Sequence, residues 1–90
     1  MDDETLIQIY YIKNAPNREK VLRAFKDEDF IRPIQIGKKT NLHPNTVSKN
    51  LKDLREHSLV YVINPEYHMP RLYRLTKKGK KFLKLLDQYE

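Results

Sequence analysis

The side chains best suited to a binding chemistry lie in residues 44–56, which read PNTVSKNLKDLRE. At helical spacing, one side of this segment is polar and mostly basic, whereas the other is apolar. Asn can form two hydrogen bonds with adenine, Lys can donate to guanine, and Ser or Thr can take either role. The segment therefore predicts a recognition helix that enters the major groove of DNA. Its candidate contact residues are Pro44, Asn45, Thr46, Ser48, Lys49, Lys52 and Arg55.

Further basic residues are candidates for phosphate contacts. Lys52 and Arg55 can hold phosphates as readily as they can reach bases. The other candidates are Lys38, Lys39, Arg71, Arg74 and Lys78, with Tyr67 and His68 beside the two arginines. Each set has an alternative interpretation. The helix can present an ordinary solvated face, the lysines can be surface lysines, and the arginine segment can serve only to close the core.

The remaining reactive residues do not predict catalysis or metal binding. The chain has no cysteine, which excludes disulfides and thiolate metal sites. His43, His57 and His68 lack the spacing of metal ligands. The acidic run 27–29 has no partnering histidine or phosphate loop and is interpreted as a turn. We therefore expect no enzyme, no cofactor, no metal and no pocket for a small ligand.

A helix-turn-helix over about residues 33–57 positions the candidate residues. Pro33 and Pro44 stand where first helical residues belong, because the missing N–H of proline would be unpaired there. Asn41 suits the left-handed conformation that ends a helix, and His43 occupies the capping place before Pro44. An inward stripe is predicted at Val47, Leu51, Leu54 and Ser58.

Other elements are predicted on both sides of this motif. A short helix over 5–13 ends before the breaker cluster 14–16, and Asn17 caps a second helix. Residues 59–63 and 71–75 have strand composition and form a hairpin, so that a wing spans about 60–75. Thr76 caps a last helix over about 77–89, which Gly79 is expected to weaken locally.

The length of the chain predicts one small domain over residues 1–90, and its charge favours a polyanionic partner. The formal net charge is +6, and it is unevenly distributed. Residues 1–30 hold seven acids and five Lys or Arg, whereas residues 31–90 hold five acids and thirteen Lys or Arg. A basic face suits phosphate neutralisation, although it can also serve solubility alone. No apolar run is long enough for a membrane span and the acidic start is not a signal peptide, so we expect a cytoplasmic protein.

The order helix, helix-turn-helix, hairpin, helix is that of a winged helix, an α+β fold. Two stretches carry a closer resemblance: 33–54, with PIQIG, PNTVSK and LKDL, and 71–80, RLYRLTKKGK. Over about residues 17–86 the chain resembles winged helix-turn-helix transcription regulators of the MarR/ArsR-like type, particularly small archaeal-type ones. Thr40, Asn41, His43 and Ser58 depart from the residues usual at those places. The cysteines of metal-sensing relatives are absent, so metal sensing is not implied.

The resemblance and the residues together predict sequence-specific binding to double-stranded DNA by a transcription regulator. Regulators of this type usually act as homodimers, and two apolar stretches suit that role: Tyr10 with Tyr11, and Phe82 with Leu86 and Tyr89. Both can instead belong to the core of one chain. The alternative function is a winged-helix protein–protein interaction module in a transcription or replication assembly. RNA binding is a third interpretation, but an aromatic stacking platform is missing.

Overall fold

The computed structural model describes residues 2–67 and 70–88, which form five helices and a two-stranded antiparallel sheet. In chain order the elements are α1 (Asp3–Lys13), α2 (Pro16–Arg23), α3 (Pro33–Thr40), α4 (Pro44–Glu56), β1 (Val60–Val62), β2 (Tyr73–Leu75) and α5 (Lys77–Gln88). This is the predicted winged-helix order. Within the described ranges, no helix has the length and apolar character needed to cross a membrane.

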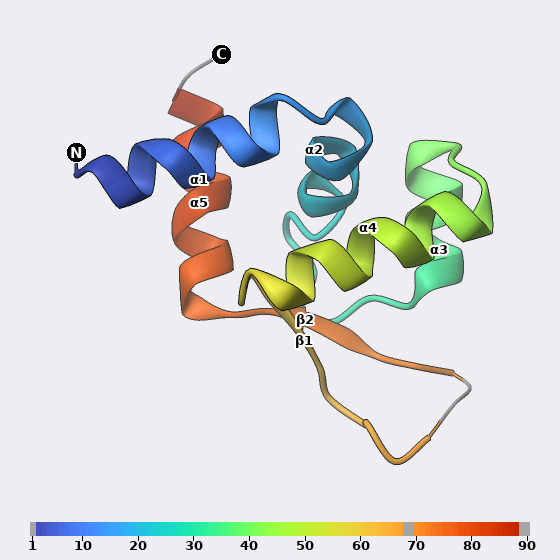
Figure 1. Ribbon diagram of the computed structural model, residues 1–90. Coiled ribbons are helices and arrows are strands. Elements are labelled where there is room, and N and C mark those ends of the chain that lie inside the picture. Colours follow the sequence, from blue (N-terminus) through green and yellow to red (C-terminus); the bar gives the residue numbers. More distant parts are fainter. Residues whose placement is uncertain (1, 68–69, 89–90) are drawn as a thin grey trace.

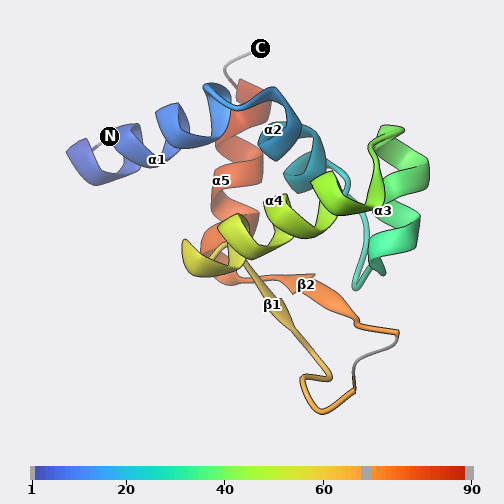
Figure 2. The same ribbon diagram turned by 45° about the vertical axis from the view of Figure 1, so that its right-hand side comes forward.

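The helices form one body, from which the hairpin projects (Figure 1). Helix α4 packs against α2 and α3, and α1 lies against α2 and α5. In both ribbon views the hairpin points away from the side on which α1 lies (Figure 2). The recognition helix and the hairpin therefore border the same region of the surface.

The core lies between the helices and is almost fully apolar. Ile12, Leu22, Phe25, Leu54 and Leu86 have 1% or less of their surface exposed. Burying a large apolar side chain contributes about 1.5–3 kcal/mol, so a core of this kind can hold a 90-residue domain together. The low apolar fraction of the chain is sufficient because its apolar residues are gathered on inward faces.

The strands are shorter than the sequence indicates. Each has three residues, and Tyr61 lies opposite Arg74 in the register. Ile31 adds a single bridge, in which its N–H and carbonyl pair with those of Tyr73 at 2.9 Å each. His68 falls outside the described residues.

One predicted detail of the helices is wrong. Helix α2 begins at Pro16 and not after Asn17, because proline takes the first helical position and Ala15 precedes it as the N-cap. Gly79 also has a steric role in α5, besides its low helix propensity. A Cβ at this buried position would overlap the carbonyl oxygen of Leu59, so the close approach of the two segments requires glycine. The predicted cap of α5 is confirmed, since the Thr76 hydroxyl accepts from the Gly79 N–H at 2.9 Å.

Candidate nucleic-acid interface

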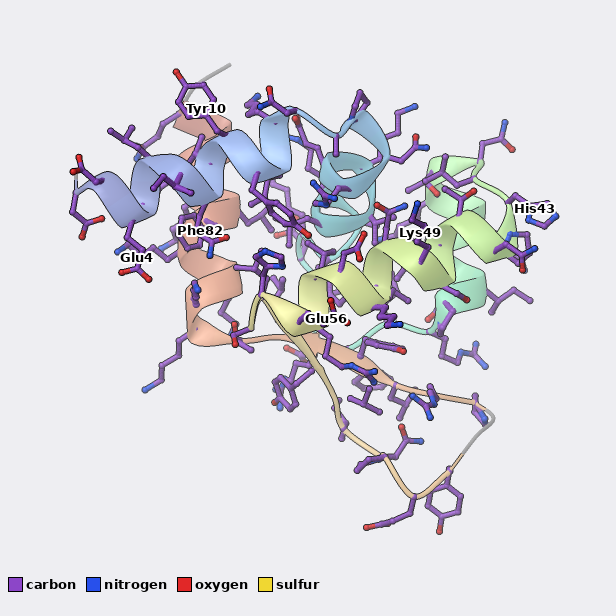
Figure 3. All side chains as sticks on the ribbon, viewed as in Figure 1. Glu4, Tyr10, His43, Lys49, Glu56 and Phe82 are labelled. Atoms are coloured by element: carbon purple, nitrogen blue, oxygen red, sulfur yellow. The ribbon has the colours of Figure 1, made fainter. Side chains whose placement is uncertain are left out.

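The turn before α4 fixes where the recognition helix begins. Asn41 ends α3 in the left-handed conformation, with φ 61° and ψ 25°. The ring of His43 then caps α4, because its Nδ1 accepts from the Asn45 N–H at 3.1 Å. Pro44 follows as the first helical residue. All three roles were predicted, and Figure 3 shows His43 at the outer end of α4.

The inner face of α4 holds the helix against the body. Val47, Leu51 and Leu54 are buried as predicted, and Asn50 is buried beside them. The Asn50 side-chain amide donates to the Thr46 carbonyl at 2.8 Å, so its polar group is not left unpaired. Ser58 does not continue the stripe. Helix α4 ends at Glu56, and Ser58 is exposed in the left-handed conformation at φ 60°.

The outer face of α4 divides into two sides. Asn45, Thr46 and Lys49 line a groove shared with the start of α2. The other side borders α3 and the hairpin, and carries Ser48, Lys52 and Arg55. All of these side chains are exposed except Thr46, which is half-buried. Lys49 and Glu56 are labelled along the helix in Figure 3.

The structure brings Arg71 to the recognition helix but not Arg74. Arg71 lines the groove that also holds Lys52 and Arg55. Arg74 is exposed on β2 and does not line that groove. Of the two arginines of the hairpin, Arg71 therefore lies on the surface beside α4, whereas Arg74 lies outside it.

Arg32 is a groove residue that sequence reasoning missed. It precedes α3 as its N-cap residue, and its backbone N–H donates to the Gln35 side chain at 2.9 Å. Its side chain lines the same groove as Arg55 and Arg71. The one weak signal in the sequence is a basic residue directly before the first residue of a helix. Only tertiary packing brings this residue beside α4.

The far end of α4 is held by a cluster from three helices. The Arg18 guanidinium lies 3.7 Å from the ring centroid of Tyr11 and donates to the Tyr11 carbonyl at 2.7 Å. His57 stacks on Tyr11 at 3.8 Å, and Arg18 Nη2 is 3.6 Å from Asp53 Oδ2. Burial raises the pKa of Tyr11 despite the nearby Arg18 charge, so its hydroxyl stays neutral at physiological pH. The cluster ties α1 and α2 to the recognition helix.

The three candidate lysines lie apart from these two grooves. Lys38 is exposed on α3. Lys39 is held within the molecule, since its Nζ is 2.8 Å from Glu28 Oε1 and donates to the Ala24 carbonyl at 3.1 Å. Lys78 is half-buried in the first turn of α5. Of these, Lys39 is the least available to a phosphate, because it already has two partners.

Two other features concern small ligands. In the described part of the chain, no three His, Asp or Glu side chains gather closely enough to hold a metal ion. An open groove of about 590 Å³ lies between α3, α4 and the hairpin. No local sequence pattern indicates this groove, since three separate segments form its walls.

Comparisons with known proteins show the fold. No protein-family model and no curated protein sequence matches the chain. Among solved structures, TubR from Bacillus thuringiensis serovar israelensis, bound to 24 bp of tubC, aligns with a TM-score of 0.82 at 16% identity. The match covers 96% of this chain and 95% of TubR.

Two further matches extend the likeness to other regulators. BpsR of Bordetella bronchiseptica, whose DNA binding is regulated by 6-hydroxynicotinic acid, has a TM-score of 0.77 at 18% identity over 96% of this chain and 72% of BpsR. MarR from E. coli has a TM-score of 0.72 at 20% identity, and this chain covers 65% of it. The predicted winged-helix fold is confirmed, and the resemblance to MarR-type regulators holds at the level of the fold.

Proposed function

We propose that this chain binds double-stranded DNA with sequence preference and acts as a transcription regulator in the cytoplasm, without catalysis. The observation that carries the proposal is the outer face of α4. It is polar and basic, begins at an ordered turn, and lies beside a projecting hairpin. Winged-helix proteins use such a helix in the major groove. The structure of TubR bound to 24 bp of tubC supports the DNA-binding part of this proposal.

In this mechanism α4 enters the major groove. Asn45, Thr46, Ser48 and Lys49 read base edges, since these side-chain types have the matching donors and acceptors. The phosphates on either side of the groove are held by Lys52, Arg55 and Arg71, with Lys38, Arg74 and Lys78 farther out. Lys39 contributes only if DNA displaces its contact with Glu28.

A salt titration tests the proposal. Mobility shifts of random duplex DNA are measured at two salt concentrations. Neutralising Z phosphates makes the logarithm of the binding constant fall against the logarithm of salt with a slope of about −0.9Z, so we expect a steep loss of affinity. Absence of binding at low salt would contradict DNA binding and favour a protein–protein role. Selection of bound duplexes from a random pool then identifies the preferred sequence.

We also propose that the chain forms a homodimer through α1. Ile7 and Tyr10 are exposed on this helix at 67% and 66%, and Tyr10 points outward in Figure 3. The Phe82 and Leu86 pair is not available for this role, because both side chains are buried in the core of one chain. Tyr89 lies outside the described residues. Sedimentation of the native chain and of Ile7→Lys tests the proposal, since a monomeric native chain contradicts it.

A further inference from the structure

The two-stranded sheet has one face on the core and one face toward solvent. Val60, Tyr73 and Leu75 point inward and are buried. Side chains alternate along a strand, so Tyr61 and Arg74 lie on the opposite face, where both are exposed. Because Tyr73 lines the groove beside α4, this opposite face looks away from the recognition helix.

The segment before α3 widens the solvent face beyond the hairpin. The bridge between Ile31 and Tyr73 places Phe30 beside Arg74. Tyr61 lies opposite Arg74 on the other side. Phe30, Arg74 and Tyr61 therefore form one row, in which the arginine lies between two aromatic residues.

This face is mostly apolar and exposed. The Ile63 N–H donates to the Leu72 carbonyl at 2.8 Å, so these two residues form the next row. Tyr61 and Ile63 each have 41% of their surface exposed, Phe30 has 52%, and Leu72 is half-buried. An apolar sheet face is normally buried against another layer of secondary structure, and a contiguous exposed patch marks an interaction site. Phe30, Tyr61, Ile63, Leu72 and Arg74 together form the outer sheet face.

The charge of Arg74 indicates what kind of surface can cover this face. Its side chain is exposed and has no ion pair within the described residues. Covering an arginine with apolar groups is strongly unfavourable unless a carboxylate comes with them, and that pair can form two parallel hydrogen bonds. The outer sheet face of a second copy would bring another arginine and no acid. A partner that brings a carboxylate therefore fits better than a second copy.

A hollow at one end of the outer sheet face offers room for an anchoring side chain. Phe30 and Leu72 line this hollow, which has a volume of about 590 Å³. Asp27 and Asp29 also line it, without an ion pair in the described part of the chain, against one arginine, Arg32. These acids repel an anionic lipid surface and the phosphates of DNA, so both fit this end of the face poorly.

We propose that the outer sheet face docks an amphipathic helix of another protein, whose apolar stripe carries one carboxylate opposite Arg74. The helix adds a further layer to the sheet, with one large apolar side chain in the hollow. Phe30 and Tyr61 supply the aromatic contacts that typically contribute most to such interfaces.

The docking site goes beyond the proposed function and does not depend on it. Because the outer sheet face lies on the far side of the sheet from α4, the helix and a DNA duplex can be bound at the same time. A bound helix pairs with Arg74 in place of an outlying phosphate and leaves the contacts of α4 free.

Selection from a displayed library of single amphipathic helices, randomised along their apolar side, tests the charge preference. The baits are the native chain, Arg74→Glu and a control, Lys20→Glu, which changes the net charge equally at an exposed residue of α2. We expect the native chain and the control to enrich helices with Asp or Glu among the apolar residues. Arg74→Glu should instead enrich Lys or Arg there. The same charge selected on all three baits, or no enrichment, overturns the proposal.

Titration of a synthetic copy of the helix enriched on the native chain locates its site. Tyr61→Ser and Ile63→Ser remove parts of the outer sheet face, whereas Ile34→Ser removes an isoleucine of α3 that is 64% exposed. We expect each of the first two to weaken binding at least about fivefold, with Ile34→Ser close to the native chain. Equal effects of the two isoleucine variants, at native-like circular dichroism, would place the helix elsewhere and overturn the site.

Adding duplex DNA distinguishes the docking site from the DNA-binding surface. The labelled helix is titrated into the complex of the protein with duplex, and its dissociation constant should stay within about threefold of the DNA-free value. Displacement of the helix by duplex would mean that the outer sheet face contacts DNA, which overturns the proposal. If the chain binds no duplex, the proposed function fails, and the selection and titration still decide whether the helix docks.

Discussion

Gly79 lies where α5 passes closest to the segment that follows α4. Two opposing effects act on Gly79→Ala. Alanine favours a helix over glycine by about 1 kcal/mol, but here its Cβ would overlap the Leu59 carbonyl oxygen, a backbone atom that cannot turn aside. Overpacking of this kind typically costs about 1–3 kcal/mol, so the steric effect outweighs the propensity.

We therefore expect Gly79→Ala to lower the free energy of unfolding in a urea titration. Lys80→Ala is the matched control, because Lys80 is exposed on the next residue of α5. A Gly79→Ala protein as stable as the control would show that the two segments separate easily.

Lys49 is the lysine whose substitution best tests base recognition. It is exposed on the side of α4 near Asn45, whereas Lys78 lies on α5 away from both grooves. We expect Lys49→Ala to lower affinity and relax sequence preference, by about 1–3 kcal/mol at the position it reads. Lys78→Ala should weaken all sequences alike and reduce the salt slope by about 1.

Binding of preferred and random duplexes across a salt series distinguishes these outcomes. If both variants bind every duplex as the native chain does, the assignment of these two lysines is wrong.

At the scale of elements, the turn between α3 and α4 depends on His43. Its Nδ1 pairs with the Asn45 N–H, one of the backbone donors left open at the start of α4. We expect His43→Ala to reduce the free energy of unfolding by about 1 kcal/mol, the usual effect of losing an N-cap. His43→Ser should retain most of the stabilisation that the cap provides, because serine is a strong N-cap residue.

Chemical denaturation of the two variants measures this contribution. Since α4 starts at this cap, His43→Ala should also weaken DNA binding more than His43→Ser does. Equal stability of both variants would mean that Pro44 and the packing of α4 fix the turn without the cap.

For the whole molecule, an ion-pair cluster between α2 and α5 links stability to pH. Arg23 Nη1 lies 2.8 Å from Asp87 Oδ1, and Lys26 Nζ lies 3.6 Å from Asp87 Oδ2. The hydrogen bond from Arg23 lowers the pKa of Asp87 below its ordinary value. Because the pKa of Asp87 is lower in the folded state, its ionised carboxylate stabilises the fold above the unfolded pKa of about 3.9. This stabilisation is lost as the pH falls through the folded pKa.

We therefore expect Asp87→Asn to lower the melting temperature at pH 7 and to flatten its decline on acidification below about pH 4. Asp29→Asn is the control, because Asp29 is exposed and has no ion pair within the described chain. If the melting temperature of Asp87→Asn declines on acidification as steeply as that of the native chain, the contact does not contribute to the pH dependence of stability.

The sequence alone determined the order of the elements and the start of the recognition helix. Local chemistry sets these features: Pro33 and Pro44 suit first helical positions, and Asn41 accepts the left-handed conformation. The apolar stripe of α4 was also readable, because helical periodicity is a property of neighbouring residues. Periodicity alone wrongly included Ser58 in the stripe, since this residue has the helical spacing but lies beyond the end of the helix.

Only the tertiary structure decided which distant residues meet. It brought Arg32 and Arg71 to the same groove as Arg55, buried Phe82 and Leu86 in the core, and placed Gly79 against Leu59. No local pattern encodes such contacts, because they depend on how helices and hairpin pack together. For the same reason the sequence did not predict the groove beside α4, because it does not show which of its residues come together.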